Sequence, residues 1–106
     1  MDYEEIIMRL IVTAGTSRNH GMNAIAQAHE GQMEETLKLI ASAREEATNA
    51  HHYQTELIQK EATGENFEIT LLTVHAQDHL MNAMTVIDLA EEFVKLYQDN
   101  RRTSHD

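Results

Sequence analysis

The chain of 106 residues contains no proline and only four glycines. These two residues interrupt helices most often, because proline lacks a backbone donor and glycine loses the most conformational freedom on folding. Gly31 and Gly64 divide stretches rich in alanine, glutamate, leucine, methionine and glutamine, all of them strong helix formers. The sequence therefore predicts three long helices, at about residues 3–29, 33–62 and 67–98.

The apolar residues within each predicted helix recur at steps of three and four, as in Ile7, Leu10, Ile11 and Ala14. This spacing gives each helix one apolar face, and short connections make neighbouring helices antiparallel. A chain of this length forms one domain. We therefore predict a single all-α domain over residues 1–106, an antiparallel up-down-up bundle of three long helices.

The ends of the predicted helices carry local sequence features. Gly64 can supply a left-handed C-cap, Asn66 can act as the N-cap of the third helix, and residues 99–106 form the expected flexible tail. Gly15 and Gly21 lie inside the first helix, where we expect a close approach of another helix or a kink.

The formal net charge is −10 at pH 7, with 18 acidic residues against eight lysines and arginines. This charge argues against nucleic-acid binding and against electrostatic attachment to an anionic membrane. Because there is no cysteine, disulfides and thiolate zinc sites are excluded. The N-terminus is acidic, unlike a signal peptide, and no apolar run approaches the roughly 18 residues of a membrane span. We therefore expect a cytoplasmic domain with no nucleic-acid partner and no direct membrane insertion.

The predicted helix 67–98 carries more apolar surface than one core-facing stripe needs. Apolar side chains occupy most of its circumference: Val74, Ala76, Leu80, Met81, Ala83, Met84, Ile87 and Ala90. A helix that is apolar all round is buried all round, which two other helices of the same chain cannot achieve. We therefore expect a partner subunit at this helix, and we expect the six methionines of the chain to lie in the core.

Four polar residues interrupt this apolar helix at positions i, i+3, i+4 and i+7, namely His75, Asp78, His79 and Asn82. The spacing places them on one side of the helix. Because it is costly to bury such groups without partners, the stripe indicates a structural or chemical role.

The residues of the stripe leave three interpretations open. One is a satisfied His–Asp hydrogen-bond network in a non-enzymatic interaction module. Another is a metal site, since antiparallel pairing of the second and third helices brings His51 level with Asp78 and His79. The third is a histidine nucleophile that attacks phosphorus, with His75 as acceptor and donors from His79 and Gln77 nearby. The charge of Asp78 must then be balanced, for instance by a cation.

Three segments resemble a known family. In chain order they are IVTAGTSRNHGMNAI, AHHYQTELIQKEATGE and VHAQDHLMNAM. They are similar to the first-helix AG-x-x-R segment, the second-helix end and turn, and the active-site helix of one group of bacterial proteins. That group is the lactose/cellobiose-type enzyme IIA of the phosphoenolpyruvate-dependent sugar phosphotransferase system. The resemblance extends over nearly the whole chain, with the motifs in the family's order.

The resemblance implies an assembly and a set of site residues. Three such subunits associate into a homotrimer, a nine-helix bundle. His75 corresponds to the phosphorylated histidine, and Asp78 to a residue that binds a metal ion on the threefold axis, one ion per trimer. That ion is hard and oxygen-liganded, with magnesium as the default. Gln77 and His79 match family residues that we assign to phosphate contact.

The resemblance also implies an activity, that of a phosphotransferase component acting as a carrier. HPr passes a phosphoryl group to His75, and the protein passes it to a cysteine of its enzyme IIB. The relay serves uptake of a β-linked disaccharide of the lactose, cellobiose or chitobiose type. The particular sugar is not readable from this chain, because the sugar contacts of the system lie in its membrane component.

Some residues depart from the family pattern. Asn19 stands where serine is common, Gln32 where aspartate is common as a cap, and Asn23 where glutamate is usual. A rival class is the histidine phosphotransfer domain of two-component signalling, also a helical bundle. Its motif has lysine and then glycine where this chain has Asp78 and His79, so it fits poorly.

Overall fold

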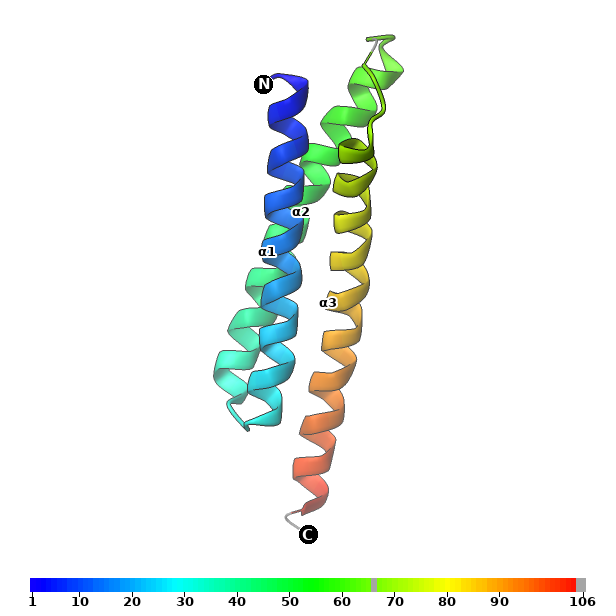
Figure 1. Ribbon diagram of the computed structural model, residues 1–106. Coiled ribbons are helices and arrows are strands. Elements are labelled where there is room, and N and C mark those ends of the chain that lie inside the picture. The colour runs from blue at the N-terminus through cyan, green and yellow to red at the C-terminus, as the bar shows by residue number, and fades with distance from the viewer. Residues whose placement is uncertain (66, 105–106) are drawn as a thin grey trace.

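The computed structural model describes residues 1–65 and 67–104, the last three of them by their backbone alone. The described residues form three α-helices and no strand: α1 Tyr3–His29, α2 Met33–Ala62 and α3 Leu71–Ser104. Successive helices alternate in direction, so α1 and α3 are parallel and α2 is antiparallel to both (Figure 1). The predicted all-α up-down-up bundle is confirmed.

Glycine ends both of the first two helices, as the sequence predicts. Gly31 and Gly64 have φ angles of 84° and 83°. After Gly31, the N–H of Gln32 donates to the carbonyl of Gln27 at 2.9 Å, and an equivalent bond follows Gly64. This is the Schellman pattern, in which glycine adopts the left-handed conformation without a steric penalty. The bounds of α1 and α2 agree with the predicted ranges.

The third helix begins at Leu71, four residues later than predicted. The ring of Phe67 lies against that of Tyr3, with centroids 3.9 Å apart, so the preceding segment is held beside the start of α1. Thr70 takes the capping position, and its hydroxyl accepts a bond from a backbone N–H of the first turn at 3.4 Å. Asn66, the predicted cap, lies outside the described residues.

The same helix also continues further than predicted, to Ser104. The guanidinium of Arg101 donates to the carbonyl of Gly31 at 3.5 Å, which attaches the last turns of α3 to the α1–α2 turn. This long-range contact supports helical structure over residues 99–104, where the sequence predicts a tail. Residues 105–106 lie outside the described part of the chain.

One continuous core joins the three helices: Ile6, Ile7, Leu10, Ala14, Ala50, Leu57, Ala76, Leu80 and Ala83. Its many alanines let the helices approach closely, and α1 packs along both of the other helices, which contact each other less. Gly21 takes part in this approach, since a Cβ added there would lie 3.2 Å from Cγ1 of Val86. Gly15 does not, because an added Cβ would meet no atom within 4 Å.

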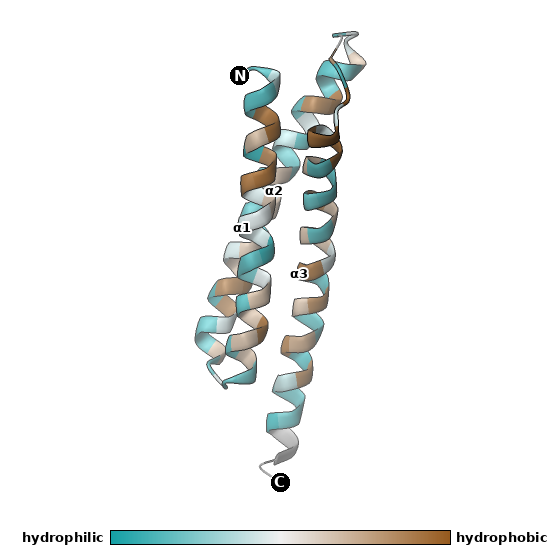
Figure 2. Cartoon of the chain, in the orientation of Figure 1, coloured by the Kyte–Doolittle hydropathy of each residue, from teal (hydrophilic) through white to brown (hydrophobic). Residues whose placement is uncertain are grey.

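The side of α3 that faces away from α1 and α2 is exposed. We call it the open face and define it by Leu71, Asp78, Met81, Thr85, Leu89 and Leu96. Figure 2 shows the first turn of α3 as strongly hydrophobic, and Leu71 there is 84 % exposed. Contrary to the expectation for a core, Met8, Met22, Met81 and Met84 are 37–49 % exposed within the single chain. Among the described helices, none combines the length and apolarity needed to cross a membrane.

Candidate functional site

His75 and His79 lie one turn apart near the start of α3 and contact each other directly. Their Nε2 atoms are 2.9 Å apart, and the rings meet edge-on with centroids separated by 4.3 Å. His75 is exposed, whereas His79 is half-buried. A hydrogen bond between two imidazole nitrogens needs one donor and one acceptor, so one of these nitrogens carries a lone pair. The i, i+4 spacing thus produces a pair of imidazoles that contains a nucleophilic nitrogen within reach of solvent.

Asp78 does not join the histidine pair. It lies on the open face, in line with Leu71 and Thr85, which are seven residues away on either side. Its carboxylate makes no hydrogen bond or ion pair with any residue that the structure describes. Asn82 is also exposed. The polar stripe predicted from the sequence therefore divides into a histidine pair and a separate carboxylate.

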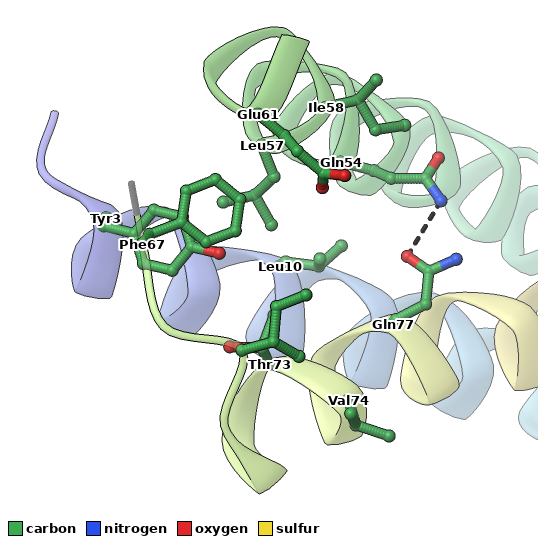
Figure 3. A pocket seen from close by; sticks show the side chains of 11 residues that line it. Tyr3, Leu10, Gln54, Leu57, Ile58, Glu61, Phe67, Thr73, Val74 and Gln77 are labelled. Carbon is green, nitrogen blue, oxygen red and sulfur yellow. Dashed lines mark hydrogen bonds between the residues drawn. The ribbon is translucent and has the colours of Figure 1, made fainter. Parts of the chain in front are cut away.

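Gln77 points toward α2. Its Oε1 accepts a hydrogen bond from Nε2 of Gln54 at 2.9 Å (Figure 3). Two residues of a helix correspond to about 200° of rotation, so Gln77 lies on nearly the opposite side of α3 from His75. Its contact with a phosphate on His75 stays a prediction. The role of Gln54 was not predicted, since it depends on a register between two helices that the connecting segment sets.

A cavity of about 260 Å³ lies on the side of α3 that carries Gln77, between α2 and the segment that leads into α3 (Figure 3). Its lining is mostly apolar and includes Tyr3, Leu57, Ile58, Phe67, Val74 and Gln77. Burial raises the pKa of Tyr3, an effect that the nearby hydroxyl of Thr73 partly offsets and that the charge of Glu61 reinforces. Neither histidine of the pair lines this cavity.

A metal site within one chain is not formed by the described residues. No three histidine, aspartate or glutamate side chains among them gather closely enough to hold an ion. His51 lines a shallow groove between α2 and α3 with Met84, on the side of α3 where Gln77 faces α2. The considered grouping of His51 with Asp78 and His79 is therefore wrong for a single chain.

Arg44 links α2 to α3 by ion pairs. Its guanidinium contacts Asp88 at 3.2 Å and Glu91 at 2.8 Å. Burial, the largest influence, lowers the pKa of Arg44, but the hydrogen bonds and charges of Glu91 and Asp88 together raise it above the ordinary value. This cation is committed to holding two helices together, and it is unavailable to the histidine pair.

Comparison with known proteins identifies the family. Residues 5–98 match the family model described as "PTS system, Lactose/Cellobiose specific IIA subunit", where PTS denotes the phosphotransferase system. The lichenan-specific phosphotransferase enzyme IIA component of Bacillus subtilis is 56 % identical over 97 residues, which cover 92 % of this chain and 88 % of that protein.

Solved structures agree with the sequence comparison. The cellobiose-specific enzyme IIA from Bacillus anthracis superimposes with a TM-score of 0.91 at 46 % identity, covering 96 % of this chain and 95 % of that one. The IIA(chitobiose) protein of Escherichia coli, solved in complex with HPr, gives a TM-score of 0.82 at 31 % identity, covering 95 % and 98 %. The match spans all three helices and both histidines of the pair, so the chain belongs to the lactose/cellobiose-specific IIA family of the phosphotransferase system and is a phosphotransferase component.

Proposed function

We propose that the protein accepts a phosphoryl group from phospho-HPr on His75 and passes it to a cysteine of its enzyme IIB. The transfer serves uptake of a β-linked disaccharide of the lactose, cellobiose or chitobiose type, and it takes place in the cytoplasm. The observation that carries the proposal is the contact between Nε2 of His75 and Nε2 of His79, 2.9 Å apart on an exposed helix turn. The complex of a related IIA protein with HPr supports the identity of the donor.

The chemistry follows from the histidine pair. A lone pair on the His75 ring attacks phosphorus in line, a new P–N bond forms, and the P–N bond to the donor histidine breaks, leaving its electron pair on the donor nitrogen. His79, one turn away, can then donate its Nε2 hydrogen to a phosphoryl oxygen instead of to His75. In the second step a thiolate of enzyme IIB attacks phosphorus, and the ring of His75 recovers the electron pair. Gln77 can add a second donor once its amide leaves Gln54.

We also propose that three copies associate through the open faces of their α3 helices. Exposed leucines along one side of a long helix are the pattern of a helix that packs against another helix. In such an assembly, a residue of the open face would lie close to the same residue of the other two subunits, around a threefold axis. In such a trimer each Asp78 would contribute one carboxylate to a shared hard cation, with Mg²⁺ as the default. The ion would neutralise three like charges, and this explains why Asp78 needs no partner within its own chain.

Phosphorylation in a reconstituted relay tests the function. The protein is incubated with phosphoenolpyruvate, enzyme I and HPr, and its intact mass is measured at alkaline pH. We expect the wild type to gain one phosphoryl group and His75→Gln to gain none. His52→Gln, which alters an exposed histidine on α2, is the matched control and should behave like the wild type.

Other outcomes point to the rival functions. If the wild type gains nothing while the HPr control is active, the phosphocarrier proposal fails. A non-enzymatic bundle would then be favoured. Acceptance from a phosphoaspartate receiver domain, but not from HPr, would favour a histidine phosphotransfer domain instead.

A further inference from the structure

We propose that Arg18 of α1 binds the phosphoryl group while it resides on His75. This inference rests on the proposed function and adds to the site a cation from a second helix. His75, His79 and Asp78 all come from α3, and they include no permanent positive charge. Stabilising a transferring phosphoryl group depends mainly on positioning and on positive or donor groups around its oxygens. In a chain of net charge −10, a phosphate beside Asp78 needs such a group.

The other cationic side chains that the structure describes are already engaged. Among the lysines and arginines whose side chains the structure describes, five form ion pairs with carboxylates: Arg9, Lys38, Arg44, Lys60 and Lys95. Arg101 donates to the carbonyl of Gly31 at the far end of the bundle. Arg18 is exposed and makes no ion pair or hydrogen bond with a described residue. Of the described cations, it is therefore the one that is available without breaking an existing contact.

The packing of α1 on α3 places Arg18 on the same side of the bundle as the histidine pair. Ser17, the neighbour of Arg18, donates to the carbonyl of Ala43 at 2.7 Å and so faces α2. Gly21 faces α3. Around the circumference of α1, the side facing α2 (Ser17) is followed by the side facing α3 (Gly21) and then by Arg18. Arg18 therefore lies at the edge of the α1–α3 contact that is away from α2.

The histidine pair of α3 lies at the matching edge of that helix. Gln77 faces α2 and Ile87 faces α1 near Gly21. Around the circumference of α3, the side facing α2 (Gln77) is followed by the side facing α1 (Ile87). His79 and then His75 come after it. Arg18 and the histidine pair thus both lie at the edge of the α1–α3 contact that is away from α2. Because the two helices are parallel, these side chains share one outer groove.

The height along the bundle also agrees. Gly21 lies level with Val86, which it contacts. Arg18 is three residues before Gly21 and His79 seven residues before Val86, so at 1.5 Å per residue Arg18 lies about 6 Å below His79 and about 12 Å below His75. Helical side chains lean toward the N-terminus of their helix, which directs the long side chain of Arg18 toward the histidines.

The guanidinium is well suited to this task. Its planar set of donors can bind two phosphate oxygens at once, which the ammonium of lysine cannot reproduce. The AG-x-x-R segment then has two functions: Ala14 packs in the core, whereas Arg18 binds the phosphoryl group.

The test compares Arg18→Gln and Arg18→Lys with the wild type. Lys38→Gln is the matched control, because it removes one exposed charge at the other end of the bundle. Each protein is phosphorylated in two ways, by phospho-HPr and by phosphoramidate, a small donor that needs no docking surface. The rate of acceptance and the ³¹P resonance of the phosphohistidine are measured, with circular dichroism as a check on folding.

We expect Arg18→Gln to slow acceptance from both donors by about tenfold and to shift the ³¹P resonance, with Arg18→Lys intermediate. Lys38→Gln should match the wild type. A wild-type rate and resonance in Arg18→Gln would overturn the proposal. So would an equal loss in Lys38→Gln, which would indicate net charge rather than contact. If the wild type itself takes no phosphoryl group on His75, the proposed function fails and the role of Arg18 fails with it.

Discussion

The two faces of α3 are both apolar, yet they have different surroundings. Toward α1 and α2, Leu80 and Ile87 are completely buried. On the open face, Leu89 and Leu96 are 54 % and 52 % exposed. The buried face meets small residues that allow close approach, whereas the open face places a carboxylate, Asp78, in line with its leucines.

The difference separates two tasks that one helix performs. The buried face holds the chain together, so changes there should act on the free energy of unfolding. The open face contributes little to the fold of one chain, so changes there should act on association and on ion binding. The histidine pair lies at the border between these faces, which leaves it exposed on a helix whose position is fixed by the core.

The largest effect on stability is expected on the buried face. Ile87→Ala should lower the free energy of unfolding by about 2–5 kcal/mol, because it leaves a cavity where the side chain is fully enclosed. Leu89→Ala is the matched control and should cost less than about 1 kcal/mol at protein concentrations where chains do not associate. Urea titration followed by circular dichroism measures both. Equal losses would show that the two faces do not differ.

On the open face, a charge should act on assembly. Leu89→Lys should convert the proposed trimer into single chains while leaving the helical content unchanged, because three desolvated ammonium groups would meet at the interface. Sedimentation equilibrium gives the mass, and Gln59→Lys on the exposed surface of α2 is the control. A trimer that survives Leu89→Lys would place the subunit interface elsewhere.

The sequence was most informative where structure is decided locally. The limits of α1 and α2 follow from Gly31 and Gly64, which supply left-handed turns. The limits of α3 do not, because contacts distant in sequence decide them: Phe67 with the ring of Tyr3 at one end, and Arg101 with Gly31 at the other.

In the candidate site too, local features could be predicted from the sequence and contacts between helices could not. The contact of His75 with His79 follows from their spacing on one helix. The orientation of Gln77 does not, since it depends on the register with Gln54 across two helices. The separation of Asp78 from the histidines also requires knowing which sides of α3 are covered.

Replacing the carboxylate on the open face should affect the ion more than the fold. Asp78→Leu should leave the helical content and the trimer intact and should remove the bound divalent cation, because an apolar axis has no charge to neutralise. Elemental analysis should find about one ion for every three wild-type chains and none for the variant. The variant should still accept a phosphoryl group. Unfolding of Asp78→Leu, or an unchanged metal content, would contradict the axial site.

The smallest effect concerns two glycines of α1 that differ in what lies opposite them. Gly15→Ala should raise the free energy of unfolding by about 0.5–1 kcal/mol, because alanine favours the helix and the new methyl group meets no atom within 4 Å. Gly21→Ala gains the same helix propensity, but its methyl group lies 3.2 Å from Cγ1 of Val86 and must displace it. We therefore expect Gly21→Ala to be less favourable than Gly15→Ala.

A second substitution shows whether crowding against the buried face of α3 is the cause. In a Val86→Ala background the atom opposite Gly21 is gone, so Gly21→Ala should recover most of the gain seen for Gly15→Ala. Thermal and urea unfolding of the four variants of this cycle measure the coupling between the two positions. If Gly21→Ala changes stability equally in both backgrounds, close approach does not explain Gly21. If Gly15→Ala and Gly21→Ala change the free energy of unfolding equally in the wild-type background, α1 is packed no more tightly at Gly21 than at Gly15.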